Sequence, residues 1–127
     1  MKNLSMLAFA AVLAAAPPAV DSESPFACNI AALTKAERTR HFEELGPKLR
    51  ALRKGVRELP DGYELAFPGD ARTVSMLLEW SAQERLCCPF FDIDIRLPRE
   101  GGPATLRLTG REGTKKFIEA DGAAWLR

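Results

Sequence analysis

The chain has 127 residues, of which 46% are hydrophobic, and a formal net charge of +1. This length and composition suit one small domain with its own core. The near-zero charge excludes the strong electrostatic attraction on which nucleic-acid binders depend, so no nucleic-acid partner is expected. Three cysteines are an odd number, so an exported form could pair two of them and would leave one over.

The first 24 residues have the pattern of a secretory signal peptide or N-terminal anchor. Lys2 precedes an apolar run over residues 4–16 that is too short to span a bilayer. Cleavage after Ala19 or Ser22 is compatible with the pattern, and residues 25–127 are expected to form a single α+β domain. We therefore expect an exported, periplasmic protein with no membrane association beyond the leader, or a cytoplasmic protein if the leader does not function.

A first helix is expected to begin at Thr34, because Thr34-Lys35-Ala36-Glu37 matches the capping-box pattern. Apolar residues then recur with helical spacing: Phe42, Leu45, Leu49, Leu52 and Val56. Gly46-Pro47 interrupts this series, which predicts one kinked helix or two short helices, the second opened by Pro47. The basic residues that follow suit the C-terminal end of a helix and are interpreted as a solvated face: Arg50, Arg53, Lys54 and Arg57.

The rest of the chain predicts a strand, a second helix, a hairpin of two strands and a last short helix. A turn at residues 59–62 leads into an alternating strand over residues 63–67. Asp70 can cap a second helix from Ala71 to about Cys87. Residues 91–97 and 104–109 alternate as the two strands of a hairpin, and a last short helix is expected from Glu112 to about Ala120, with Phe117 and Ile118 as its apolar anchors. The order α-β-α-β-β-α predicts a small α+β domain with a three-stranded, mainly antiparallel sheet and helices on one face.

Residues 80–91 are the most distinctive stretch, because two adjacent cysteines, Cys87 and Cys88, lie where a helix ends at Pro89 and a strand follows. On a helical wheel, one face contains Val74, Leu77, Leu78 and Ser81 and continues to Glu84 and Cys88. Cys88 is thus expected to point toward the core. A carboxylate such as Glu84 is costly to bury on that face unless it is paired.

The cysteines suggest a site for a soft metal. Thiolates select Hg(II), Cu(I), Zn(II) and, by the same logic, As(III). Two adjacent thiols chelate such an ion poorly, so Cys87 and Cys88 would need Cys28 as a third ligand. Glu84 and the only histidine, His41, are peripheral candidates. The sequence leaves open whether Cys28 reaches the other two.

Other interpretations compete with a metal site. The cysteines can be structural, with Cys28 in a disulfide to Cys87 or Cys88 of a non-catalytic interaction domain. They can also belong to a thiol-redox enzyme in which Cys87 or Cys88 attacks and Cys28 resolves, although a helix C-terminus raises a thiol pKa. The sequence thus leaves open whether the chain is an enzyme, and the position of the cysteines favours one less than a binding or structural role.

The polar residues near these cysteines have ordinary structural interpretations. Glu84 is expected to pair with an arginine such as Arg85, or to reach water at a frayed helix end. His41 is expected to be partly exposed on the first helix. Asp92 and Asp94 share the polar face of a strand and are expected to be solvated rather than to form an acid–base pair.

Several of these features together resemble a known family. Ala27-Cys28 near the start, Gly62-Tyr63, the run Glu84-Arg85-Leu86-Cys87-Cys88-Pro89-Phe90 and the later Leu108-Thr109-Gly110 occur in this order. The pattern resembles a family of small uncharacterised bacterial proteins that share the Ala-Cys and a Glu-Arg-x-Cys-Cys-Pro-Phe core, some of them associated with MerR-type regulators or metal resistance. The resemblance implies thiol–metal chemistry, and it also implies a cytoplasmic location, because these relatives have no export leader.

Overall fold

The computed structural model describes residues 12–15 and 23–127 of the chain. The expected signal or anchor over residues 1–24 falls largely outside these residues. The helical elements are η1 (Ile30–Ala32), α1 (Lys35–Arg38), the π-helical segment η2 (Thr39–Leu45), α2 (Gly46–Leu52), α3 (Ala71–Cys87), η3 (Arg99–Gly101), α4 (Thr114–Asp121) and α5 (Ala123–Leu126). The strands are β1 (Gly55–Leu59), β2 (Gly62–Phe67), β3 (Asp92–Arg96) and β4 (Ala104–Thr109).

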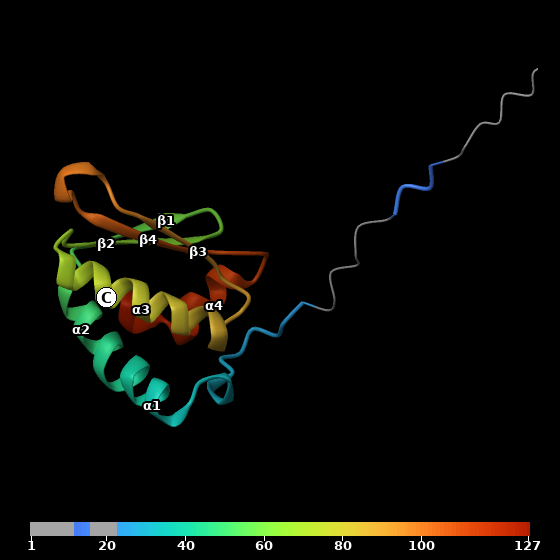
Figure 1. Cartoon of the computed structure of the whole chain (residues 1–127), viewed down its shortest axis with the longest axis horizontal. Helices are drawn as coiled ribbons and strands as arrows, with labels where there is room; N and C mark the ends of the chain where they lie inside the picture. Colours follow the sequence, from blue (N-terminus) through green and yellow to red (C-terminus); the bar gives the residue numbers. More distant parts are fainter. Residues whose placement is uncertain (1–11, 16–22) are drawn as a thin grey trace, which may run out of the picture.

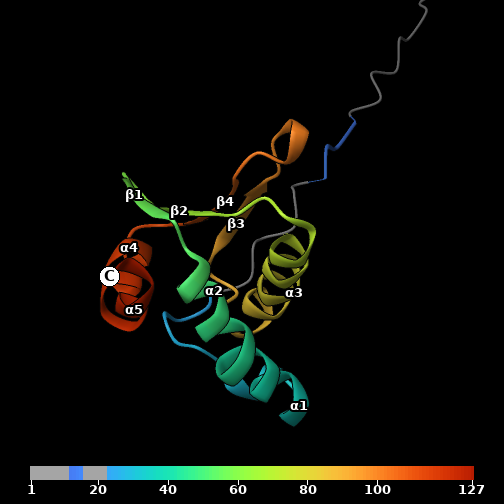
Figure 2. The ribbon, with the colours of Figure 1, turned by 90° about the vertical axis from the view of Figure 1, so that its left-hand side faces the viewer.

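The four strands form one antiparallel sheet in the order β1-β2-β4-β3. The α+β class and the antiparallel pairing expected from the sequence are confirmed, but the expected number of three strands is wrong. All the larger helices lie on one side of this sheet (Figure 1). Seen from the side, α3 lies beneath one part of the sheet and α4 and α5 beneath the other, with α2 between them (Figure 2).

The missed strand is β1, which was expected to be the end of the first helix. It is an edge strand, and no residue in it is fully buried, so it shows none of the apolar alternation that identifies a strand. Arg57, expected at a helix end, instead binds Glu64 on β2 at 3.0 Å. The expected turn is a two-residue hairpin that joins Leu59 to its partner Gly62.

Local capping signals fix the starts of the helices as expected. The Thr34 side chain accepts a hydrogen bond from the Glu37 N–H, and the Glu37 carboxylate accepts one from the Thr34 N–H. The Asp70 side chain accepts a hydrogen bond from the Thr73 N–H and begins α3 at Ala71, as predicted. These two caps set where α1 and α3 enter the fold.

The first helical stretch is continuous from α1 to α2, but it widens into a π-helix between them. The Gly46 N–H donates to the His41 carbonyl, five residues back. Pro47 has no N–H to continue the α-helical ladder, and a wider turn keeps its ring away from the preceding carbonyls. A Cβ at position 46 would approach the His41 oxygen to 3.1 Å, so glycine suits this turn.

The core lies between the helices and the sheet, and its apolar residues come from every layer: Leu45, Leu49, Leu65, Phe67, Leu77, Trp80, Ala104, Leu106, Leu108 and Ile118. The wheel placed the buried face of α3 slightly wrongly. Leu78 is 47% exposed, whereas Trp80 and Cys87, which the wheel did not include in the buried face, are buried. Phe42, on the first helical stretch, is 44% exposed for a different reason, because the π-helix shifts the phase of that stretch.

Candidate metal and thiol site

A second, smaller cluster of buried residues surrounds the cysteines at the end of α3. It consists of Leu33, Cys87, Cys88 and Phe90, with Phe26, Phe91 and Phe117 packed against it. Phe26 meets Phe90 edge-on, with ring centroids 5.2 Å apart. The aromatic contacts hold the N-terminal segment against the end of α3.

A backbone contact brings Cys28 to the other cysteines. The Asn29 N–H donates to the Cys87 carbonyl at 2.7 Å, at the end of α3 where carbonyls lack helical partners. The three sulfurs of Cys28, Cys87 and Cys88 consequently lie within 4.8 Å of one another. All three cysteines are free thiols; Cys28 is exposed, while Cys87 and Cys88 are buried.

His41 and Glu84 meet beside the cysteines. The Nε2 atom of His41 lies 2.7 Å from Oε2 of Glu84, and its Nδ1 lies 3.0 Å from Oε1 of Gln83. Oε2 of Glu84 also lies 3.6 Å from the Cys87 sulfur. One atom each from His41, Glu84 and Cys87 therefore forms a second close group that shares Cys87 with the three-cysteine group.

Two expectations about these residues are wrong. His41 is 1% exposed, not partly exposed, because the π-helix turns its ring onto Trp80, where the two rings stack with centroids 5.3 Å apart. Glu84 is 9% exposed, and its partner is His41 rather than Arg85 or another arginine. Asp92 and Asp94 are exposed on β3, as expected.

Sequence reasoning also missed Gln83 and Trp125. Gln83 is buried next to Glu84 and binds His41. The signal available in the sequence was that Gln83 and Glu84 are adjacent polar residues near the end of a helix that packs on the core. Trp125 on α5 packs against Trp80, with ring centroids 4.9 Å apart, and no local pattern in the last residues of the chain pointed to that contact.

The close packing of these groups shifts their pKa values. Contact with the Cys88 thiol lowers the pKa of Cys87 to about 4, opposed by burial and helped by His41 and Cys28. Contact with Cys87, and then burial, raises the pKa of Cys88. Burial and the contact with Cys87 raise the pKa of Cys28 to about 12. One lowered pKa beside two raised ones favours a single negative charge within the group of three sulfurs at neutral pH.

Interactions with the cysteines also shift the pKa values of His41 and Glu84. Burial by itself lowers the pKa of His41, but its interactions with Cys87 and Glu84 outweigh burial and raise that pKa to about 9. Burial raises the pKa of Glu84, and the contact with His41 offsets only part of this effect. A charged His41 can donate from both ring nitrogens, which matches acceptors on both Gln83 and Glu84.

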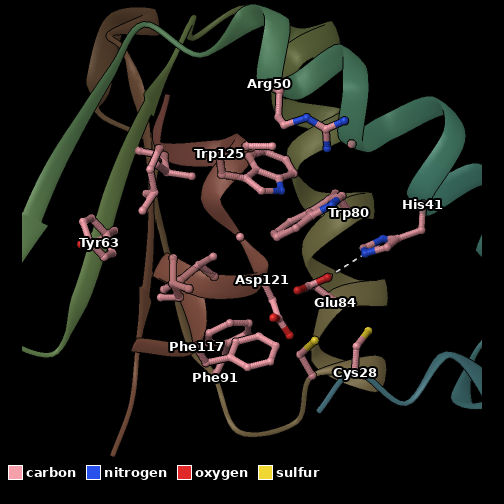
Figure 3. Close-up of a pocket in the computed structure, with 18 of the residues that line it drawn as sticks. Cys28, His41, Arg50, Tyr63, Trp80, Glu84, Phe91, Phe117, Asp121 and Trp125 are labelled. Carbon is pink, nitrogen blue, oxygen red and sulfur yellow. Dashed lines mark hydrogen bonds and ion pairs between the residues drawn. The ribbon is translucent and has the colours of Figure 1, made fainter. Parts of the chain in front are cut away.

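An apolar cavity of about 310 Å³ opens beside the sulfurs. Cys28, Glu84 and His41 lie along one side of it, and Trp125, Phe91 and Phe117 lie across from them (Figure 3). The cavity lies between α3, the sheet and the C-terminal helices. A ligand held by the cysteines would therefore have space on one side.

Comparisons of the chain with protein-family models, with curated proteins and with solved structures found no match. None of the helices within residues 12–15 and 23–127 is both long enough and apolar enough to cross a membrane. The three close cysteines, with His41 and Glu84 beside them, could hold a metal ion. What the site binds is inferred from this donor set.

Proposed function

We propose that the protein binds one soft metal ion through Cys28, Cys87 and Cys88, in metal resistance or sensing. The observation that supports this most directly is that three sulfurs from two separate segments lie within 4.8 Å of one another. Soft ions such as Hg(II), Cu(I), Zn(II) and As(III) prefer thiolate ligands. His41 and Glu84 then orient and charge-balance the sulfur ligands, as outer groups do at many metal sites.

The spacing of the sulfurs suits a metal. A metal–sulfur distance of about 2.3 Å places two ligands of a tetrahedral ion roughly 3.8 Å apart. The sulfurs of Cys87 and Cys88 are 3.9 Å apart. The lowered pKa of Cys87 favours one thiolate in the group at neutral pH, and metal binding then displaces protons only from the other two.

Native mass spectrometry of the reduced protein with one equivalent of Hg(II), Cu(I) or Zn(II), together with a count of free thiols, tests this proposal. We expect one metal per chain and protection of all three thiols. Cys28→Ser should weaken binding tenfold or more, about 1.4 kcal/mol or more. Asn29→Ala is the matched control, because it keeps the backbone N–H that contacts Cys87.

The result that would contradict the proposal is a protein that takes up no metal. One remaining thiol and a mass lower by two hydrogen atoms would show a disulfide plus one free cysteine. Unchanged metal binding in Cys28→Ser would restrict the site to the adjacent pair. A stable fold in Cys87→Ser and Cys88→Ser, with no metal and no turnover in the parent, would leave the cysteines a structural role.

Thiol-redox activity is a second candidate, favoured by the close group of His41, Glu84 and Cys87. A thiolate on Cys87 would attack a disulfide substrate, form a mixed disulfide and release one substrate thiolate. Cys28 or Cys88 would then attack the Cys87 sulfur, release the second thiolate and leave a protein disulfide for an external thiol to reduce. Turnover of a small disulfide by metal-free protein, lost in Cys87→Ser, would favour this function.

A further inference from the structure

We propose that the metal reaches this site carrying one aromatic substituent, as an arylmercury cation does, and that the substituent occupies the apolar cavity beside the cysteines. This inference rests on the proposed function and specifies the class of ligand. A bare ion coordinated by three sulfurs would leave most of the cavity empty. An apolar group attached to the metal would fill it.

The size and position of the cavity support this ligand class. Its volume of about 310 Å³ lies at the lower end of the range for small-molecule sites, about 300–1,000 Å³. Cys28 and Cys88 form part of its wall, so a metal held by their sulfurs would face directly into it. Figure 3 shows Cys28 at the same end of the cavity as Phe91 and Phe117.

The walls suit an aromatic ring in particular. Trp80 and Trp125 are inclined at 52° with centroids 4.9 Å apart, and Phe91 and Phe117 meet at 65° with centroids 6.0 Å apart. These two inclined pairs both line the cavity. They offer both faces and edges, which are the contacts that a bound aromatic ring prefers.

Most of the polar side chains at the cavity have partners within the protein, and the Asp121 carboxylate, which also lines it, would repel an anionic substituent. The Tyr63 hydroxyl donates to Glu119 at 2.8 Å. The Arg50 guanidinium lies over the Trp125 ring, 5.4 Å from its centroid. His41 and Glu84 bind each other. A charged or strongly polar substituent would have to displace these contacts, whereas an uncharged aromatic group would not.

The binding step is a ligand exchange with no change of oxidation state. The sulfur of one of the three cysteines forms a sulfur–mercury bond to the arylmercury cation, and its thiol proton passes to the small thiolate that carried the cation, which leaves with its electron pair. The mercury–carbon bond is unchanged. The other two cysteines are placed to add to the same metal, each releasing its thiol proton to solvent, and the aryl group extends into the cavity.

Competition binding to the full-length reduced protein tests the inference, with phenylmercury, methylmercury and Hg(II) as probes and glutathione as the competing thiol. The two organic cations have the same charge and the same bond to sulfur, so they differ only in the apolar group. We expect the protein to prefer phenyl over methyl by about tenfold more than glutathione does, because the ring leaves water for an apolar wall. Quenching of Trp80 and Trp125 fluorescence by the bound mercury gives a second readout.

Trp125→Ala should lose most of the phenyl preference and keep the affinity for Hg(II), since it removes a wall and no sulfur. Phe91→Leu, which keeps the site apolar but removes an aromatic face, is the second variant if Trp125→Ala does not fold. Leu86→Ala is the control, because Leu86 is an exposed apolar residue on α3 that does not line the cavity.

The outcomes separate the two proposals. If Hg(II) protects all three thiols but the phenyl preference equals that of glutathione, the inference is overturned and the proposed function stands. An equal phenyl preference in Trp125→Ala, Phe91→Leu and the parent would overturn it too. If Hg(II) does not bind through the three thiols at all, the proposed function itself fails.

Discussion

The imidazole of His41 meets the carboxylate of Glu84 at 2.7 Å in the interior, although 43 residues separate them in the chain. The contact joins the π-helical segment to the last turn of α3, next to the Cys87 sulfur. The stability of the fold should therefore depend on pH, with His41 and Cys87 acting in opposite directions.

Between about pH 6.5 and 9, we expect the stability of the parent protein to vary little with pH. His41 has a raised pKa, so its contribution is complete below the unfolded value of 6.5 and is lost as the pH rises through about 9. Cys87 has a lowered pKa, so its contribution is complete above the unfolded value of 9.0 and is lost as the pH falls through about 4. Between 6.5 and 9 the slopes of His41 and Cys87 oppose each other, and below 6.5 the loss from Cys87 is opposed only by Glu84, whose pKa is raised.

Urea unfolding at several pH values measures this balance. Cys87→Ser removes the slope from Cys87 and also the interaction that most raises the pKa of His41. Relative to the parent, its stability should therefore rise as the pH falls from about 6.5 toward 4, because only the parent loses the contribution of Cys87 there. A constant difference between parent and variant over this range would contradict this account.

The charge on Cys87 can also be observed directly. Reduced protein should show the ultraviolet absorbance of one thiolate per chain at neutral pH, and it should lose this absorbance as the pH falls through about 4. Cys87→Ser should abolish the signal at neutral pH. Ser81→Ala, a change on the same helix at a hydroxyl that donates to the Leu77 carbonyl rather than to a sulfur, should leave it intact. A signal that appears only above about pH 8 would show that the thiolate is not stabilised.

Gly113 lies against Phe26, which is two residues from Cys28. Its φ is +101°, and a Cβ there would lie 2.5 Å from the Phe26 ring. Gly113→Ala should displace Phe26, loosen the segment that carries Cys28 and reduce metal affinity tenfold or more, about 1.4 kcal/mol or more. Gly101→Ala is the control, since its φ is also positive, at +68°, with open space around it. Equal affinities in the two variants would show that Phe26 does not position Cys28.

Neighbouring leucines on α3 provide a test of the core. Leu77 is 0% exposed and Leu78 is 47% exposed, although the helical wheel put both on the buried face. Leu77→Ala should lower the free energy of unfolding by about 2–5 kcal/mol, because it leaves a cavity in the core. Leu78→Ala should cost less than about 1 kcal/mol. Denaturant titrations of the two variants measure the difference, and similar losses would mean that α3 has a different orientation.

Elements with a local signal could be predicted from the sequence. The Thr34 and Asp70 caps determine helix starts through residues three positions apart, and alternation identified the hairpin of β3 and β4. β1 could not be found in this way, because an edge strand with little burial has no apolar face to alternate.

The site was only partly predictable, for a different reason. The two adjacent cysteines and the buried position of Glu84 follow from the sequence of one helix. The approach of Cys28 depends on a backbone contact between Asn29 and Cys87, and the approach of His41 depends on a widened helical turn. Both are tertiary effects between segments far apart in the chain, and residue spacing carries no information about them.

The widened turn at Thr39–Leu45 makes segment length a functional constraint. A π-helical turn accommodates one residue more than an α-helical turn does. Deleting a single residue between His41 and Gly46 would restore the tighter winding and rotate the preceding part of the helix by about 100° relative to α2. The histidine would then leave Glu84, while the downstream leucines kept their places in the core. A shortened chain of this kind could therefore fold normally and still lose the charge balance around its thiols.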